Sequence, residues 1–505
     1  MRSISPVSPS SRIAVPEGVE LRQLCAEAEQ TPLYNEDLAP IPRARRSWGA
    51  WNYTALWISM SAALTNYTLA SGLMAAGMLW WQALLTITLG NLIVLIPMLL
   101  NAWVGVRFGI PFPVFVRAAF GTEGAKVAAM ARGLVGCGWF GIQTWLGGLA
   151  LSALLSHFWT AWMGIAGHEF FAFGAFWLVQ MAIVSRGMGA IKRFESAAAP
   201  ILLLLLLTLM IWALYVGPGF LATLRASTQL TASSSYTFWE LFWPGLAANV
   251  GNWATLSLNI PDFTRYAKSQ RAQLIGQSIG LPLGMMGTSF VGLFVTAAAL
   301  EVFHKTLWNP IELIPYLTDN GFLLLLALGV ILLAQTSINM GANVVSPSND
   351  FSNLAPRWIS FRLGGLLTGI VGILMCPWLL MEHAGAYIFT WLAGYGSLLG
   401  AIAGVMIADY WVWRRQDLSL IDLYRVSGRY GRWNWPAFVA MALAIMPLIP
   451  GFLTAAVSPG GIVKHPDFLD RIYTYGWLWT FAVAGVGYLL LQLLRRRQAL
   501  RSQYA

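Results

Sequence analysis

A tryptophan and a glutamine stand four residues apart in the apolar segment Gly136–Gly148. On a helix such positions share one face, so the Trp139 indole and the Gln143 amide point the same way. An indole stacks on a flat ring, and an amide donates and accepts hydrogen bonds at the edge of that ring. The pair therefore predicts a surface for a flat heterocycle. The alternative is purely structural: Trp139 fills a gap between helices, and Gln143 forms a hydrogen bond to a neighbouring helix.

A second apolar segment, Pro244–Asp262, contains Gly251 followed directly by Asn252 and Trp253. A Gly-Asn pair is a plausible helix break, and broken helices occur at membrane depth only where they line a cavity. Trp253 would then offer a second stacking surface and Asn252 a side-chain amide. The alternative is a glycine that only permits close packing.

Small and polar residues also interrupt two other apolar segments. In Ala334–Pro347, Asn339 and Asn343 are four residues apart, which predicts a face that lines a pathway. The segment Trp57–Gly72 contains several Ser, Thr and Asn residues and could be locally unwound as well. Broken segments at matching positions are typical of transporters built from inverted repeats.

The composition indicates which elements position these residues. The 505 residues are 57% hydrophobic and only 10% charged, which excludes a set of soluble domains. The apolar runs are solid rather than alternating, so they predict membrane-spanning helices. We expect an all-α polytopic membrane protein with twelve transmembrane helices, at about 48–76, 80–105, 125–158, 168–186, 195–217, 238–261, 274–303, 321–345, 361–381, 384–411, 435–456 and 473–495.

The positive charges test this topology. All but four of the 31 Lys and Arg residues fall in the N-terminal tail, the even-to-odd loops, the C-terminal tail or the helix ends that adjoin them, the exceptions being Arg225, Lys305, Lys464 and Arg471. The positive-inside rule then places both termini in the cytoplasm, with tails at 1–46 and 496–505. The net charge of +10 is explained by this topology and does not indicate a nucleic-acid partner.

Charged side chains are expected only at helix ends, and Glu195 is placed at the start of the fifth segment. A cavity without a fixed charge favours a neutral, hydrogen-bonding solute over a strongly charged one. The sequence has no HExxH, P-loop, GxSxG or Cys/His metal cluster, so an enzyme is not expected.

Six stretches together resemble the first nucleobase–cation symporter family. These stretches are Leu33–Pro40, Trp48–Asn52, Gly138–Gly147, Asn259–Arg265, Ala342–Phe351 and Ala408–Trp411. The resemblance implies a leucine-transporter-like fold with two inverted five-helix repeats and two further helices. We expect the repeats at 47–217 and 238–411, and the extra helices at 435–495.

The resemblance also implies which residues bind substrate and ion. Two tryptophans sandwich the ring and amides read its edge, which assigns Trp139, Gln143, Trp253 and Asn343. Asn252 stands where the hydantoin branch has a Gly and would tune selectivity. A sodium site would use Ser59, Ala62, Ala334 and Ser337, but Ile338 replaces an expected hydroxyl, so the coupling ion is either sodium or a proton.

We therefore expect a monomeric inner-membrane symporter, without a cofactor, that imports a neutral ring such as uracil, allantoin, hydantoin or a purine. The expected partners are this substrate, the coupling cation and the lipid bilayer. The alternatives are a facilitator of the same solutes and a permease for a vitamin of the thiamine or pyridoxine type. Phe389 or Trp391 could cover the site, although ordinary packing is the better explanation for each residue.

Overall fold

The structure is a computed structural model that describes residues 31–317, 321–380, 390–458, 463 and 466–504. In these ranges the chain is built from helices, and the only extended pairing is an isolated bridge between Trp48 and Ala267. The prediction of an all-α protein is therefore confirmed. The segment 1–30, most of the predicted N-terminal tail, lies outside the described residues.

Each of the twelve predicted segments contains helix in the structure. The unbroken ones are α4 (Trp80–Phe108), α7 (Gly124–Phe158), α8 (His168–Val184), α9 (Met188–Val216), α15 (Gln270–Phe303), α17 (Gly321–Ile338) with η4 (Asn339–Val344) and α18 (Val345–Leu354), α19 (Phe361–Leu374), α21 (Ala393–Ile407) with η6 (Ala408–Trp413), α22 (Trp435–Ile445) with η8 (Met446–Leu448) and α23 (Ile449–Val457), and α25 (Gly476–Tyr504). Eight of these helices are long and apolar enough to cross a membrane, while α8 and α19 are shorter.

The first and sixth segments are each broken in two, as predicted. The first consists of α2 (Ala50–Ser61) and α3 (Leu64–Ala75), separated by Ala62 and by Ala63 in an extended conformation. The sixth consists of α12 (Phe238–Asn252) and α13 (Ala254–Asn259), and the break falls on Trp253, next to the expected Gly251 and Asn252. The two breaks leave backbone groups without helical partners deep inside the bundle.

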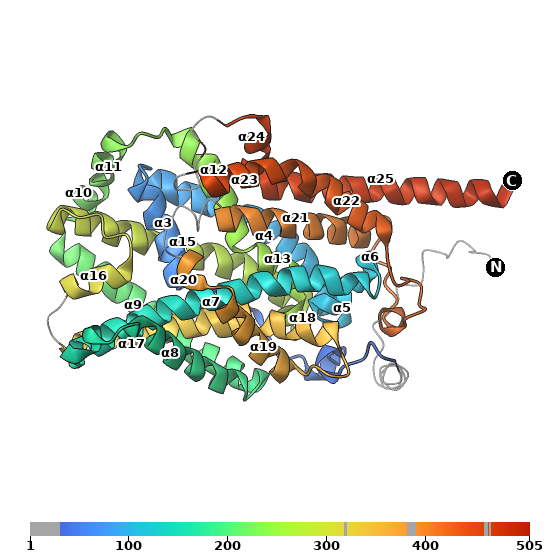
Figure 1. Ribbon diagram of the computed structural model, residues 1–505, viewed down its shortest axis with the longest axis horizontal. Coiled ribbons are helices and arrows are strands. Elements are labelled where there is room, and N and C mark those ends of the chain that lie inside the picture. Colours follow the sequence, from blue (N-terminus) through green and yellow to red (C-terminus); the bar gives the residue numbers. More distant parts are fainter. Residues whose placement is uncertain (1–30, 318–320, 381–389, 459–462, 464–465, 505) are drawn as a thin grey trace.

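The membrane helices pack in two groups that meet at these breaks. The helices α2, α3, α4, α12 and α15 pack on one another, and α7, α8, α17, α18 and α19 form a second group. Figure 1 shows the helices running along the long axis of the molecule, with α5 (Phe112–Phe115), α6 (Arg117–Phe120) and the end of α25 together at one end. At the other end lie α10 (Phe220–Arg225), α11 (Ser227–Ser233) and α16 (Pro310–Leu317).

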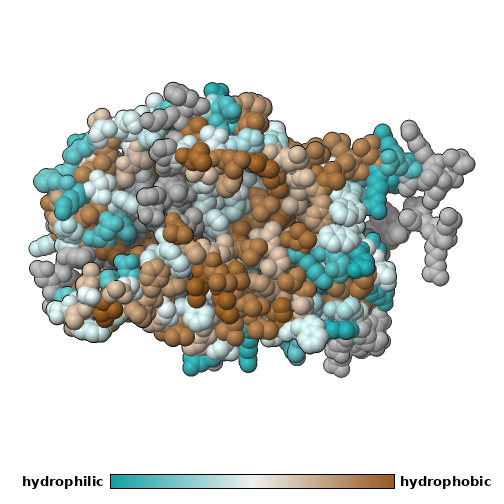
Figure 2. All heavy atoms as spheres, in the orientation of Figure 1, coloured by the Kyte–Doolittle hydropathy of each residue, from teal (hydrophilic) through white to brown (hydrophobic). Residues whose placement is uncertain are grey.

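The surface agrees with a membrane protein. On the face shown in Figure 2, hydrophobic residues form a band across the middle of the molecule, and hydrophilic residues gather toward both ends. The short remaining elements are η1 (Glu36–Leu38), η2 (Arg43–Arg45), η3 (Thr160–Gly164), α14 (Pro261–Thr264), α20 (Pro377–Leu380), η7 (Ile421–Tyr424) and α24 (Phe468–Thr474).

Candidate functional site

A small cavity lies where the two helix breaks meet α7 and α17. Its lining residues are Thr65, Trp139, Asn252, Trp253, Thr255, Leu256, Ile338, Ala342 and Asn343. Its volume is about 10 Å³, enough for about one water molecule, so the side chains are closed around it. Four of the five residues predicted to bind substrate therefore line one cavity, and its described wall contains no charged side chain.

The Trp139 indole is held by a tyrosine that sequence reasoning missed. Its Nε1 donates to the hydroxyl of Tyr395 on α21 at 2.9 Å, and this hydroxyl donates to the carbonyl of Gly251 at 2.9 Å. Tyr395 thus ties α7 to the end of α12 beside the break. Trp391, a suggested cover, contacts the Tyr395 ring at 5.2 Å, whereas Phe389 lies outside the described residues.

Trp253 occupies the break in the sixth segment itself. Its ring meets the edge of Trp57 on α2, with centroids 5.1 Å apart and planes at 84°. Among the described residues, its indole N–H has no hydrogen-bond partner. Trp139 and Trp253 come from different helix groups and line the same cavity, so a flat ring that separates the groups could contact both indoles.

The side chain of Asn66 joins the two breaks. Its Nδ2 donates to the carbonyls of Met60 and Ser61, at 3.1 and 3.0 Å, and so satisfies two groups freed where α2 ends. Its Oδ1 accepts from Nδ2 of Asn252 at 2.8 Å. Nδ2 of Asn252 is therefore already hydrogen-bonded to Asn66. Oδ1 of Asn252 accepts no hydrogen bond from the described residues.

Asn343 lies in a π-helical turn, η4, which interrupts the eighth segment. Such turns are frequently found at functional sites. Its Nδ2 donates to Oδ1 of Asn339 at 2.9 Å, and Asn339 in turn donates to Gln180 of α8 at 2.7 Å. The Asn343 carbonyl oxygen therefore remains as an acceptor for a ligand, because no described donor bonds to it.

Gln143 is placed differently from the other four predicted residues. It is fully buried and does not line the cavity. Its Nε2 donates to Oγ1 of Thr65 at 2.9 Å, and its Oε1 accepts from Nε2 of Gln335 at 2.7 Å. Gln335 also approaches the backbone N–H of Leu64, at 3.4 Å. In this closed conformation both ends of the Gln143 amide support the first helix break.

The expectation that charged residues lie only at helix ends is wrong. Arg132 of α7 is fully buried; its Nε donates to Asn259 at 2.9 Å and its Nη2 to the Ala342 carbonyl at 3.1 Å. Asp350 lies 3.9 Å from it and is also buried. Glu195 is well inside α9, which begins seven residues earlier than predicted, at Met188, and is 7% exposed.

Of the four residues expected to form a cation site, Ser59 and Ser337 contact Glu195 directly. Ser59 Oγ and Ser337 Oγ are 2.5 Å apart, and both contact Oε2 of Glu195, at 2.8 and 2.7 Å. Ala62 and Ala334 pack in the same small apolar cluster. Sequence reasoning missed Glu195 because it comes from a distant helix, and no spacing links it to Ser59 or Ser337.

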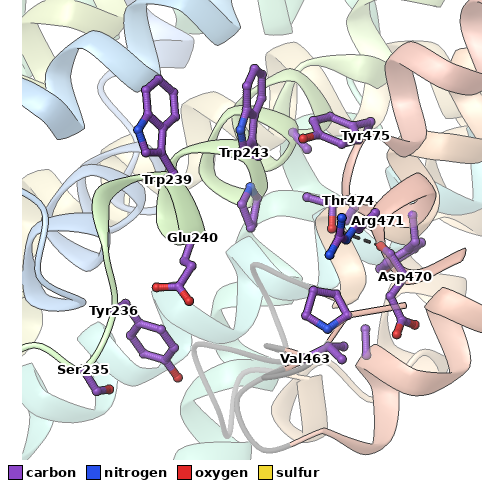
Figure 3. Close-up of a pocket in the computed structure, with 16 residues that line it drawn as sticks. Ser235, Tyr236, Trp239, Glu240, Trp243, Val463, Asp470, Arg471, Thr474 and Tyr475 are labelled. Carbon is purple, nitrogen blue, oxygen red and sulfur yellow. Dashed lines mark hydrogen bonds between the residues drawn. The ribbon is translucent and has the colours of Figure 1, made fainter. Parts of the chain in front are cut away.

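A cavity of about 630 Å³ lies elsewhere. Figure 3 shows Trp239, Trp243 and Tyr475 along it, together with Glu240, Asp470 and Arg471. Its described lining comes from α12, α21, α23, α24 and the adjoining loops, and contains no residue of α2, α3, α7 or α17. This cavity is therefore separate from the site at the helix breaks.

Comparison with known proteins places this architecture in a family. The family of permeases for cytosine/purines, uracil, thiamine and allantoin matches residues 40–479. The chain belongs to this permease family. A purine–uracil permease of Arabidopsis thaliana is 39% identical over 487 residues, which cover 92% of this chain and 79% of the relative. An allantoin permease of Bacillus subtilis is 35% identical over 481 residues, which cover 92% of this chain and 94% of the relative.

A solved structure of similar fold supports the same assignment. It is the nucleobase-cation-symport-1 family transporter Mhp1 in a closed conformation with bromovinylhydantoin bound. This permease superposes on it with a TM-score of 0.75 at 26% identity, covering 90% of this chain and 95% of that one. The likeness confirms the expected leucine-transporter-like fold of a multi-pass membrane protein.

Proposed function

We propose that this permease is a secondary active transporter that imports a neutral, nucleobase-like heterocycle together with a cation. The observation that carries the proposal is the uncharged cavity where two broken helices bring Trp139, Trp253, Asn252 and Asn343 together. Relatives named for purines, uracil, allantoin and hydantoin support this substrate class, because all four are rings or ring systems with amide-type edges.

In this proposal the ring lies between the two indoles and its edge is read by side-chain amides. Stacking on an aromatic side chain contributes about 1–3 kcal/mol per base in nucleic-acid sites, and each amide hydrogen bond adds about 0.5–1.5 kcal/mol. Asn343 and Asn252 offer carbonyl oxygens to ring N–H groups. Gln143 joins them when the break rearranges, since its amide is otherwise bonded to Thr65 and Gln335.

Transport proceeds by alternating access, with the α2, α3, α4, α12 and α15 group moving against the group that contains α7 and α17. The inverted repeats at 47–217 and 238–411 provide the two related halves. The two extra helices at 435–495 follow them. The coupling ion binds beside Ser59, Ala62, Ala334 and Ser337, where α2 meets α17. We place the monomeric protein in the cytoplasmic membrane with both termini inside, as the distribution of positive charge favours.

A competition assay tests the proposal. Uptake of labelled uracil into cells that express the permease is measured with unlabelled allantoin, hydantoin, adenine, thiamine and pyridoxine as competitors. Inhibition by at least one neutral ring, with the label recovered chemically unchanged, is the expected result. Accumulation above the external concentration identifies a coupled carrier, whereas equilibration alone identifies a facilitator. Absence of uptake and of exchange for every ring overturns the proposal.

A further inference from the structure

A fully buried arginine lies next to the substrate cavity but is not part of its lining. Arg132 of α7 has no exposed surface, and it precedes Trp139 by seven residues, which is about two helical turns or roughly 10 Å along the axis. Placing a charged side chain inside a membrane protein is costly, and residues that carry this cost usually have a function. The proposed substrate site leaves Arg132 without one, so its contacts must show what it does.

The Arg132 side chain bonds to both groups of helices. Its Nε donates to Oδ1 of Asn259 at 2.9 Å, and its Nη2 donates to the carbonyl of Ala342 at 3.1 Å. Asn259 ends α13, which packs on α4 of the first group, whereas Ala342 lies in η4, between α17 and α18 of the second group. Ala342 also lines the substrate cavity and directly precedes Asn343. One guanidinium group therefore connects α13 to the cavity wall that carries a predicted ligand of the ring.

The amide of Asn259 is held from its other end as well. Its Nδ2 donates to the hydroxyl of Ser346 on α18, and the whole side chain is buried. Both ends of this amide thus bond to the second group, although its helix packs on the first. We call the four residues Arg132, Asn259, Ala342 and Ser346 the inner link.

The sequence of α7 makes room for this arrangement. A Cβ at Gly136 would lie 2.8 Å from Nη1 of Arg132 and 2.5 Å from Cγ of Pro347, so a glycine lets the arginine side chain run between α7 and α18. Asp350 of α18 supplies a countercharge 3.9 Å from Nη1, but neither of its carboxylate oxygens accepts a hydrogen bond from the described residues. The hydrogen bonds of Arg132 are therefore made to the inner link and not to its counterion.

The inner link separates the substrate cavity from a second cavity. This second cavity has a volume of about 530 Å³, and its lining includes Asp262, three residues after Asn259, and Asn349, three residues after Ser346. Asp262 accepts a hydrogen bond from the backbone N–H of Phe112 in α5 at 3.0 Å, so the cavity lies at the end where Figure 1 shows α5 and α6. The charge distribution places this end in the cytoplasm. The inner link thus lies between the bound ring and the cytoplasm.

From these observations we infer that Arg132 is the positioning residue that closes the substrate cavity toward the cytoplasm. The inference rests on the proposed transport function. While both hydrogen bonds of Arg132 are made, α13 is held against η4 and the cavity stays shut on this side. When α13 moves with the first group, the bond to Asn259 breaks, whereas the bond to the Ala342 carbonyl remains. Arg132 thus acts through Asn259 and does not contact the ring.

Access of a thiol reagent to the cavity tests this inference without requiring transport. Thr255, which lines the cavity from α13, provides the reporter: Thr255→Cys is introduced into the full chain after its three native cysteines are changed to alanine. Inside-out membrane vesicles present the cytoplasmic face to a membrane-impermeant methanethiosulfonate reagent. We expect slow modification in this parent and about tenfold faster modification after Arg132→Gln, because the hydrogen bonds of a charged donor are lost.

Arg117→Gln is the matched control. Arg117 of α6 is equally buried, and its guanidinium bonds to the Asn353 side chain and to the carbonyls of Leu33 and Leu423, none of which lines the substrate cavity. This change removes the same charge from the interior, so we expect it to lower stability while the rate of modification stays at the parent value. Arg132→Lys keeps the charge but lacks the planar fork that bonds two partners, and it should give an intermediate rate.

Equal modification rates in the parent and in Arg132→Gln overturn the inference, and so does an equal rise in Arg117→Gln. If Arg132→Gln does not assemble in the membrane, Asn259→Ala decides the matter, since it removes the same bond and keeps the arginine with its counterion. A rise of about tenfold then supports the inference, and an unchanged rate contradicts it. Counterflow of labelled uracil, allantoin and hydantoin by the unsubstituted chain is measured in parallel. Its absence with every probe would refute the proposed transport function, whereas the access rates report on the inner link alone.

Discussion

Substitution of Asn66 tests whether the two helix breaks form one functional unit. This amide makes three hydrogen bonds: two donated to the Met60 and Ser61 carbonyls and one accepted from Asn252. The side chain is 1% exposed, so water has little access to replace it. Each bond contributes about 0.5–1.5 kcal/mol, so Asn66→Ala should cost roughly 2–4 kcal/mol. This range corresponds to a loss of about 30-fold to several hundredfold in an equilibrium that requires the intact break.

The assay combines uptake kinetics with thermal inactivation of the purified protein. We expect kcat/KM for uptake to fall at least tenfold in Asn66→Ala, with earlier inactivation on heating. Asn66→Asp should be worse than alanine, because an ionised carboxylate cannot donate to the two carbonyls and lies against them. Asn91→Ala is the matched control: Asn91 is equally buried, but its amide donates only to the Ile87 carbonyl within α4.

Asn91→Ala should lower thermal stability slightly and leave uptake unchanged. Parent-like uptake by Asn66→Asp would refute the idea that donation to the freed carbonyls holds the first break. Equal losses in Asn66→Ala and Asn91→Ala would show that any buried amide has the same effect, and the link between the breaks would then carry no function.

Three further substitutions have direct readouts. Trp253→Ala should raise KM for flat rings about tenfold to a hundredfold, since roughly 1–3 kcal/mol of stacking is lost; an unchanged KM would remove this indole from the site. Asn343→Ala should change the order of inhibitors in the competition panel, because it removes an edge acceptor, whereas a uniform loss for all rings would contradict a recognition role. Gly251→Ala should abolish uptake, because a Cβ there would lie 2.6 Å from the Leu392 carbonyl. Gly287→Ala, where a Cβ meets nothing within 4 Å, should retain uptake and serves as the control.

The sequence predicted the breaks and most of the cavity because these features depend on local composition. Gly251, Asn252 and Trp253 interrupt an apolar run, and Asn343 stands in a polar stretch of an otherwise apolar segment. A polar residue inside a membrane helix must find a partner or line a cavity, so such residues indicate the interior face. The alternative for Gly251, close packing, is also supported, since the glycine contacts the backbone of α21.

The sequence did not predict Tyr395, Gln335 or Glu195, since their roles depend on contacts between distant helices. Tyr395 bonds Trp139 from 256 positions away, and Glu195 meets Ser337 from 142 positions away. Basic residues before Glu195 suggested a loop, which moved the predicted helix start to the glutamate itself. In the structure α9 begins earlier, so Glu195 is carried into the bundle.

The proposed function requires a neutral solute to be coupled to a charge, and the two candidate sites are separate. No charged side chain lines the substrate cavity among the described residues, so the ring and the ionisable group do not interact directly. Glu195 instead acts on Ser59 and Ser337, and Ser337 is bonded through the backbone to Ile338 in the cavity wall. On the proposed function, coupling would pass through the positions of α2 and α17. We then expect residues of the substrate cavity to select the ring, and the site around Ser59 and Ser337 to select the ion.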